Sequence, residues 1–291
     1  MEDLLQSFLI TETSKENPFF EARLTKWLRD SDEFQNFAIR NKPSIAKKIR
    51  DIQEEEDLWD VFYELEVGYY LTLVPETRVI IYQPKNSSEI SSRNPDYFVS
   101  FEEEEFYLEV ARIRDNQNLE RQKFTYEDEN GILIDTGAER LIDRTAKIKD
   151  IIFSKLTQLV DLKPNVLFIL TESPDFDFLS IQRAVYWIGK QIKNRKESYF
   201  HDKKWTGSGI EYFLEHWKKL SAIVFKDTFR EQSVERIQGA TFPISSNLAD
   251  CLINLRAKGE LSKQELIEKR NLLGPEQFAY QYAHQFQTPT K

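Results

Sequence analysis

The first strong periodic signal in the chain is a helix between residues 54 and 73. Its apolar positions recur every three or four residues, which places them on one face: Leu58, Phe62, Leu65 and Tyr69. Upstream, the pattern predicts shorter helices within residues 1–50. We expect breaks near Pro18 and again near Pro43, because proline interrupts helical hydrogen bonding.

After Pro75 the pattern changes from helix to strand. Three short segments, separated by polar residues, are rich in β-branched and aromatic side chains: 77–82, 97–101 and 106–113. The glutamates at 102–105 predict a solvated turn between the last two strands. So short a connection favours antiparallel pairing.

The second half of the chain alternates between helix and strand. We expect a helix at 138–160, a buried apolar strand at 166–170, a helix at 178–193 and a strand at 221–225. Residues beyond 262 predict a helical tail. This order describes an α/β fold in which helices flank a mixed central sheet.

Composition narrows the class of protein. The chain has 291 residues, 40% of them hydrophobic, which is enough for a sizeable core. We expect a helical segment at 1–53, a central domain at 54–230 and a mostly helical extension at 231–291. A single cysteine excludes an intrachain disulfide and a thiolate zinc site. The sequence has no apolar run of about 20 residues, so we expect no membrane span and a cytoplasmic protein.

Two acidic residues lie close together in the predicted hairpin. Asp96 follows Pro95 at the start of one strand, and Glu109 interrupts the mostly apolar neighbouring strand. Strand geometry puts Glu109 on the face of Ala111 and opposite that of Arg112. Such a carboxylate is costly unless it is paired or binds metal, and two close carboxylates favour a hard cation such as Mg²⁺ or Mn²⁺. A turn aspartate and a surface glutamate are an equal alternative.

The helix at 54–73 carries two candidates for a third carboxylate, Glu64 and Glu66. They lie two positions apart, about 200° around the helix axis, so only one can face a shared site. Glu66 has aromatic neighbours, whereas periodicity alone assigns Glu64 to a solvated strip. The pattern does not choose between them.

Three short segments together resemble the PD-(D/E)xK nuclease superfamily, which has the restriction-endonuclease-like fold. They are Phe62-Tyr63-Glu64-Leu65, Pro95-Asp96-Tyr97-Phe98-Val99 and Phe106-Tyr107-Leu108-Glu109-Val110-Ala111. The resemblance covers roughly residues 55–170 and implies an αβββαβ core and metal-dependent hydrolysis of DNA. It implies catalytic roles for Glu64, Asp96 and Glu109. We expect Mg²⁺ or Mn²⁺ to be held by Asp96, Glu109 and the Val110 carbonyl, with Glu64 binding a second metal or positioning water.

The superfamily pattern has a lysine two positions after the strand glutamate, where this chain has Ala111. In the superfamily this lysine sometimes lies on the following helix. There the sequence shows one continuous stripe, made of Leu141, Thr145, Ile148, Ile152, Lys155 and Leu159. A lysine on such a face either extends to solvent or meets a carboxylate. Lys155 is therefore the candidate replacement, with Lys147 or no lysine at all as the alternatives.

A basic segment near residue 195 is a candidate contact for nucleic acid, despite the formal charge of −9 for the whole chain. Its basic residues are Lys190, Lys193, Arg195, Lys196, Lys203 and Lys204. Aromatic residues lie among them, at Trp187, Tyr199, Phe200 and Trp205. A solvated helix end and surface loop is an equal alternative.

DNA is the expected partner, and RNA, a homodimer or a larger complex stay open. The rival interpretation is a non-catalytic nuclease fold that binds nucleic acid or a protein partner. The missing lysine at Ala111 and the acidic composition favour that rival.

Overall fold

The computed structural model describes residues 18–74, 77–84, 94–114, 125–127, 133–135, 144–171, 176–201, 209–227 and 232–254. Within them a six-stranded sheet has the order β1-β2-β3-β6-β7-β8. Its strands are β1 (Thr77–Tyr82), β2 (Tyr97–Phe101), β3 (Glu104–Ile113), β6 (Asn165–Thr171), β7 (Leu220–Asp227) and β8 (Gln232–Arg236). The β3–β6 and β6–β7 pairs are parallel and the other three are antiparallel. The expected mixed sheet is confirmed.

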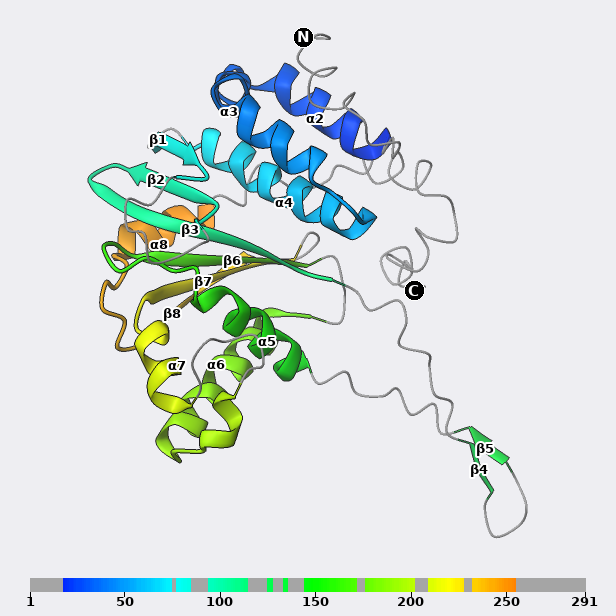
Figure 1. The fold of residues 1–291 in the computed structure, drawn as a ribbon, viewed down its shortest axis with the longest axis vertical. Coiled ribbons are helices and arrows are strands. Elements are labelled where there is room, and N and C mark those ends of the chain that lie inside the picture. Colours follow the sequence, from blue (N-terminus) through cyan, green and yellow to red (C-terminus); the bar gives the residue numbers. More distant parts are fainter. Residues whose placement is uncertain are drawn as a thin grey trace, which may run out of the picture.

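Helices cover both faces of this sheet (Figure 1). One face carries α2 (Pro18–Asp30), α3 (Asp32–Arg50), α4 (Glu55–Thr72) and α8 (Ser246–Asn254). The other carries α5 (Arg144–Leu156), α6 (Phe178–Lys193), the short 3₁₀ helix η1 (Glu197–Phe200) and α7 (Ile210–Trp217). Two further strands, β4 (Thr125–Glu127) and β5 (Leu133–Asp135), pair only with each other.

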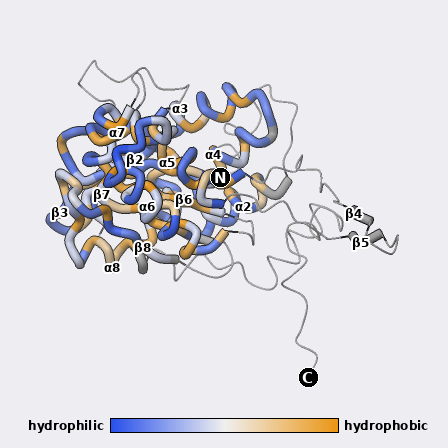
Figure 2. The backbone as a smooth tube through the Cα atoms, turned by 90° about the horizontal axis from the view of Figure 1, so that it is seen from below, coloured by the Kyte–Doolittle hydropathy of each residue, from blue (hydrophilic) through white to orange (hydrophobic). Residues whose placement is uncertain are grey.

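Two hydrophobic cores lie on opposite sides of the sheet, and β6 serves both. Val166, Phe168 and Leu170 face the first core, under α4, whereas Leu167 and Ile169 face the second. This alternation explains why the strand reads as one continuous apolar run. Along the helices the hydropathy changes between apolar and polar, as expected for elements with one buried face (Figure 2).

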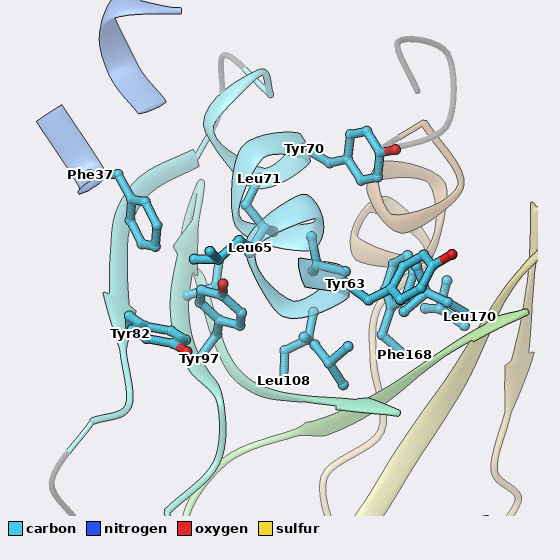
Figure 3. Packing of buried hydrophobic residues seen from close by; sticks show 14 of the residues in the cluster. Phe37, Tyr63, Leu65, Tyr70, Leu71, Tyr82, Tyr97, Leu108, Phe168 and Leu170 are labelled. Atoms are coloured by element: carbon cyan, nitrogen blue, oxygen red, sulfur yellow. The ribbon is translucent and has the colours of Figure 1, made fainter. Parts of the chain in front are cut away.

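A close approach of α4 to β2 positions the candidate site. Gly68 lies inside α4, where glycine costs about 1 kcal/mol relative to alanine. A Cβ atom at this position would lie 2.7 Å from the Tyr97 hydroxyl oxygen. That hydroxyl donates a 2.7 Å hydrogen bond to the Glu64 carbonyl. The glycine therefore allows Tyr97 to tie the helix to the strand, and Figure 3 shows Tyr97 packed beneath α4.

Most predicted elements agree with the structure. The helix at 54–73 and the strands at 77–82 and 97–101 are confirmed, as is the helix at 178–193. The strand predicted at 106–113 begins earlier, at Glu104, because Glu102 and Glu103 alone form the turn. Glu102 adopts a left-handed conformation there, with φ 49°.

The predicted helix break at Pro43 is wrong, because α3 runs through it as one helix. Proline removes one hydrogen bond, to the carbonyl of Ile39 four residues earlier. Both Ile39 and Pro43 lie on the exposed face of α3, where water can satisfy that carbonyl. Ser31 instead separates α2 from α3 and caps the second helix by accepting a hydrogen bond from the Phe34 amide.

The helix predicted at 138–160 is shorter, since α5 ends at Leu156 and residues 138–143 are outside the described residues. The strands expected at 166–170 and 221–225 are present and slightly longer, as β6 and β7. Helix α7 and strand β8 were not predicted. Helix α8 lies in the extension expected to be mostly helical, but that extension also contributes β8 to the central sheet. The expected helical tail beyond 262 lies outside the described part of the chain. Among the helices that are described, none combines the length and apolar character needed to cross a bilayer.

Candidate functional site

The β2–β3 hairpin brings Asp96 next to Glu109. Tyr97 pairs with Leu108 in antiparallel register. Asp96, just before Tyr97, therefore lies opposite Glu109, just after Leu108. The Val110 amide donates a 2.9 Å hydrogen bond to Asp96 Oδ2, which fixes this carboxylate against β3. Both acids are buried, with exposed fractions of 6% for Asp96 and 2% for Glu109. The antiparallel pairing expected for this hairpin is confirmed.

The α4 glutamate that faces this hairpin is Glu64. The Tyr82 hydroxyl of β1 donates a 2.9 Å hydrogen bond to Glu64 Oε2. Tyr82 and Tyr97 lie side by side beneath α4, with ring centroids 5.3 Å apart (Figure 3). Only 12% of the Glu64 side chain is exposed, so its assignment to a solvated strip is wrong. Periodicity missed this burial because α3 and β1, rather than apolar neighbours on α4, enclose the carboxylate.

Lys155 extends from α5 to the acids. Its Nζ atom lies 2.5 Å from Glu109 Oε1, and 24% of its side chain is exposed. A lysine on this apolar stripe was expected either to extend to solvent or to meet a carboxylate. In the structure Lys155 meets a carboxylate. Lys147, the alternative lysine, instead donates to the Arg114 carbonyl.

A second lysine, Lys48 of α3, also enters the site and was not predicted. Its Nζ atom contacts Glu64 Oε2 and lies 3.2 Å from Asp96 Oδ1. On α3 the buried residues Phe37, Ile45 and Ile49 recur at helical spacing. Lys48 lies three positions after Ile45, on the edge of that face. The signal is the same as for Lys155, a lysine on an apolar stripe, but the two acids that it meets lie 16 and 48 residues away along the chain.

The acids and lysines strongly perturb one another. Burial, followed by the charge of Asp96, raises the pKa of Glu109 to about 8, although the Lys155 ammonium opposes this. Burial and Asp96 likewise raise the pKa of Glu64 to about 7. For Lys48 and Lys155, burial lowers the pKa, but the neighbouring carboxylates outweigh it and raise the pKa above its usual value. Both lysines therefore stay protonated, while Glu64 and Glu109 lose their protons less readily than ordinary glutamates.

A cavity of about 150 Å³ adjoins the acids and is lined by residues of α4, β3 and α5. Glu64, Ala111 and Lys155 are among them. The small side chain at Ala111 leaves open the space where the superfamily pattern has a lysine. Of the three acids Glu64 lines this cavity, so a small ligand in it would reach Glu64 and Lys155.

The chemistry of the donors fits a hard divalent cation. Glu109 Oε2 is buried and has no hydrogen-bond partner among the described residues, although a buried carboxylate oxygen normally has one. Carboxylate oxygens are the ligands that Mg²⁺ and Mn²⁺ prefer. As the side chains stand, however, no three histidine, cysteine or acidic residues of the described ranges are grouped to hold a metal ion. Ammonium groups already contact Glu64, Asp96 and Glu109.

Arg112 points away from Glu109, as strand geometry predicts. Its Nε donates a 3.0 Å hydrogen bond to Asp60 of α4, and its guanidinium also contacts Glu56. Arg114 extends this network with a 3.0 Å contact to Asp57. These ion pairs join β3 to the first half of α4. They help to hold Glu64 and Glu109, which lie on the same two elements, in a constant relative position.

The basic segment predicted to contact nucleic acid lies on and after α6. Lys190, Lys193, Arg195 and Lys196 are all exposed, whereas Lys203, Lys204 and Trp205 lie outside the described residues. Phe200 is buried in the second core and Tyr199 packs against it, so these two rings serve the core. Trp187, with 41% of its surface exposed, is accessible for stacking.

Comparisons of the chain with models of protein families, with curated proteins and with solved structures gave no match.

Proposed function

We propose that the protein is a metal-dependent nuclease of the PD-(D/E)xK type, which hydrolyses phosphodiester bonds of DNA. The proposal is supported above all by the unpartnered Glu109 Oε2, buried beside two further carboxyls and next to a cavity that Lys155 lines. An excess of buried acid over hydrogen-bond donors is costly in a purely structural cluster. A divalent cation would remove that cost.

Asp96 and Glu109 would hold the cation, and the Val110 amide keeps Asp96 in place for this purpose. Bound Mg²⁺ or Mn²⁺ supplies a Lewis acid for the phosphate oxygen and lowers the pKa of an attacking water. Glu64, on the opposite wall, would position that water or bind a second ion. The Lys155 ammonium, held by Glu109, would stabilise the negative charge that develops on the phosphate.

The proposed role of Lys155 can be tested by moving the lysine. Lys155→Met should lower the cleavage rate by about tenfold or more, because one cation next to the phosphate is lost. Adding Ala111→Lys should recover part of that loss, since the position borders the same cavity. A single Ala111→Lys variant controls for overpacking. If Lys155→Met cleaves as well as wild type, Lys155 is not the replacement for the motif lysine.

The principal test of the nuclease is cleavage of supercoiled and linear DNA with manganese. Asp96→Ala and Glu109→Ala should each lower the rate by about hundredfold or more, as expected when charge stabilisation in the transition state is lost. Glu105→Ala is a matched control, because it removes an exposed acid from the same strand. Activity that survives both site substitutions would exclude these acids, and circular dichroism would confirm that the variants fold.

The exposed face of α6 is the surface that we propose for the nucleic acid. Residues 178–196 contain five basic residues and no acidic one, in a chain whose net charge is −9. The basic residues are Arg183, Lys190, Lys193, Arg195 and Lys196. Tyr186 and Trp187, exposed by 65% and 41%, lie among them, and the Lys190 ammonium lies 4.6 Å from the centre of the Trp187 ring. Cations for phosphates and rings for bases are what a nucleic-acid strand requires.

This surface can be tested apart from catalysis, by fluorescence anisotropy with labelled DNA and the Asp96→Ala variant. Trp187→Ala should weaken binding by about tenfold if a base stacks on the ring. Lys190→Ala should reduce the salt dependence of binding by about one unit of log slope if that lysine contacts a phosphate. Lys163→Ala, which removes a partly exposed lysine bound to Glu105, is the control. Equal effects from Lys190→Ala and Lys163→Ala, with none from Trp187→Ala, would indicate general electrostatic attraction and no defined surface.

The second candidate function is a nuclease fold without catalysis, which binds nucleic acid or a protein partner. The specific observation in its favour is that Lys48 and Lys155 already contact the three acids, while Ala111 replaces the motif lysine. Calorimetry with Mn²⁺ separates the two functions. The nuclease requires manganese binding that Asp96→Ala abolishes, whereas the non-catalytic module predicts no binding to either protein.

A further inference from the structure

Lys48 competes for an atom that a metal ion would need. Asp96 has two carboxylate oxygens, and both are in use. Oδ2 accepts the Val110 amide, and Oδ1 lies 3.2 Å from the Lys48 ammonium. A cation shared between Asp96 and Glu109 requires at least one of these oxygens.

Of the two partners of Asp96, only Lys48 can withdraw. Val110 belongs to β3, which is paired on one side with β2 and on the other with β6, so its amide is fixed in the sheet. Lys48 instead lies near the end of α3 on a long side chain, of which 25% is exposed. Its Nζ atom also contacts Glu64 and lies 5.4 Å from the centre of the Tyr82 ring. The ammonium can therefore leave Asp96 and keep its other neighbours.

Lys155 differs from Lys48 in this respect. It contacts Glu109 Oε1 and leaves Oε2 without a partner, so it occupies none of the oxygens that the proposed site needs. The two lysines carry the same charge and lie at the same cluster. Lys155 is compatible with a metal ion at Asp96 and Glu109, whereas the Lys48 ammonium, 3.2 Å from Asp96 Oδ1, would repel an ion bound to that oxygen.

We propose that Lys48 is an internal cation that occupies the metal position in the metal-free protein and is displaced from Asp96 when a divalent ion binds. This inference rests on the proposed metal site. In the metal-free protein Lys48 holds Glu64 and Asp96 together, so that the site is assembled before the ion arrives. The cost is a lower apparent affinity for the ion, because only molecules in which the ammonium has left Asp96 can bind it.

The test is calorimetric titration of the metal-free protein with Mn²⁺, which requires no activity. Lys48→Met should bind Mn²⁺ with a dissociation constant about tenfold lower than that of wild type. Lys155→Met is the matched control, since it removes the same charge from the same cluster without freeing an oxygen of Asp96. Its dissociation constant should change by a much smaller factor. Lys48→Arg keeps the charge at this position and should bind no more tightly than wild type.

A second measurement protects the test against misfolding of Lys48→Met. Its melting temperature in chelator should be lower than that of wild type, because Glu64 and Asp96 then repel each other without a cation between them. Saturating Mn²⁺ should raise its melting temperature by more than it raises that of wild type. A smaller increase in the variant would contradict the displacement of Lys48.

The outcomes distinguish this inference from the proposed function. If wild type binds Mn²⁺ and Asp96→Ala does not, the metal site stands. If Lys48→Met then binds no more tightly than Lys155→Met, the two lysines act only through their charge, and displacement of Lys48 is overturned. If wild type fails to bind but Lys48→Met binds, Lys48 blocks the site and is not displaced by the ion, and the inference is overturned. If none of these proteins binds, the proposed function and this inference both fail.

Discussion

Glu64 and Glu66 lie two residues apart on α4, and both are enclosed by other elements, yet their surroundings differ. Glu66 is a single carboxyl that hydrogen-bond donors and cations surround. The Tyr70 hydroxyl donates a 2.6 Å hydrogen bond to Glu66 Oε1, and the Arg23 guanidinium lies 3.9 Å from the same atom. A further cation, the Lys226 ammonium, lies 3.6 Å from the centre of the Tyr70 ring. In this cluster the cations outnumber the acid.

Around Glu64 the balance is reversed. Three carboxyls meet two ammonium groups, and Glu109 Oε2 has no donor among the described residues. The pKa of Glu64 and of Glu109 is raised accordingly, to about 7 and about 8. Buried charge by itself therefore does not indicate a functional site, because both clusters have it. The informative feature is an excess of like charge next to a cavity, since a bound cation can remove that excess where otherwise a proton must.

The largest expected effect is on stability, and it separates the two glutamates. Glu66→Ala should lower the free energy of unfolding by about 3 kcal/mol, because it leaves the buried Arg23 and Tyr70 without this acceptor. Glu64→Ala should change it by less than about 1 kcal/mol, because Lys48 keeps Asp96 as a partner and one like charge is removed. Urea denaturation of the metal-free variants, followed by circular dichroism, measures both values.

Glu66→Gln is the control for this comparison, since it keeps an acceptor for Tyr70 and removes only the charge. It should cost less than Glu66→Ala. The effects on Mn²⁺ binding should have the opposite order to the effects on stability. Glu64→Ala should weaken Mn²⁺ binding, and Glu66→Gln should leave it unchanged. Equal stability losses for the two alanine variants would mean that the clusters are energetically alike, and the contrast between them would be lost.

The next effect is a pH dependence of the free energy of unfolding. It follows from the excess of carboxyls over ammonium groups around Glu64 and Glu109. Burial and the charge of Asp96 raise the pKa of Glu109 from an ordinary value of 4.5 to about 8 in the folded protein. Between these values the folded state binds more protons than the unfolded state, so stability is highest below pH 4.5 and falls as pH rises to about 8. We expect the metal-free protein to lose about 3 kcal/mol between pH 5 and pH 8 from this group.

Glu109→Gln should flatten that part of the profile, because its amide does not titrate. Denaturant titrations at several pH values, in the presence of chelator, measure the slope. Glu66→Gln, measured in parallel, shows how much of the slope belongs to the other cluster. Stability that rises from pH 5 to pH 8 in wild type and not in Glu109→Gln would reverse the predicted sign and contradict an excess of acid.

The same contrast explains how much of the site could be predicted from sequence. Asp96 and Glu109 are joined by a short hairpin, so alternation along the strands was enough to bring them together. Lys155 was predicted because it interrupts an apolar stripe on the helix after the hairpin. Lys48 lies 48 residues from Asp96 along the chain, and its position depends on how α3 packs against α4 and β1. Local periodicity contains no information about such packing.

Periodicity could not choose between Glu64 and Glu66 for the same reason. Periodicity compares a residue with its neighbours on one helix, and by that measure Glu66 was the enclosed acid and Glu64 the solvated one. The structure encloses both, from different sides. Fold class was more predictable than the site, because the order of strands and helices depends on local patterns. The continuity of α3 through Pro43 is an exception, because it depends on which face of the helix meets solvent.

The smallest effect that we predict uses a matched pair of tyrosines. Tyr70 donates to Glu66 at 2.6 Å and Tyr82 donates to Glu64 at 2.9 Å. Tyr70→Phe should lower the free energy of unfolding by about 1.5 kcal/mol, as expected for a buried hydrogen bond to a charged group. Tyr82→Phe should cost less than about 1 kcal/mol, because Glu64 keeps the Lys48 ammonium and the loss of a donor favours the protonated carboxyl that this cluster already prefers. Repeating the measurement with Mn²⁺ is the sharper test. The ion should alter the change in unfolding free energy caused by Tyr82→Phe and should leave the change caused by Tyr70→Phe as it was. If both substitutions cost the same and neither responds to manganese, the hydrogen bonds to the two glutamates are equivalent, and the excess of acid around Glu64 has no measurable consequence.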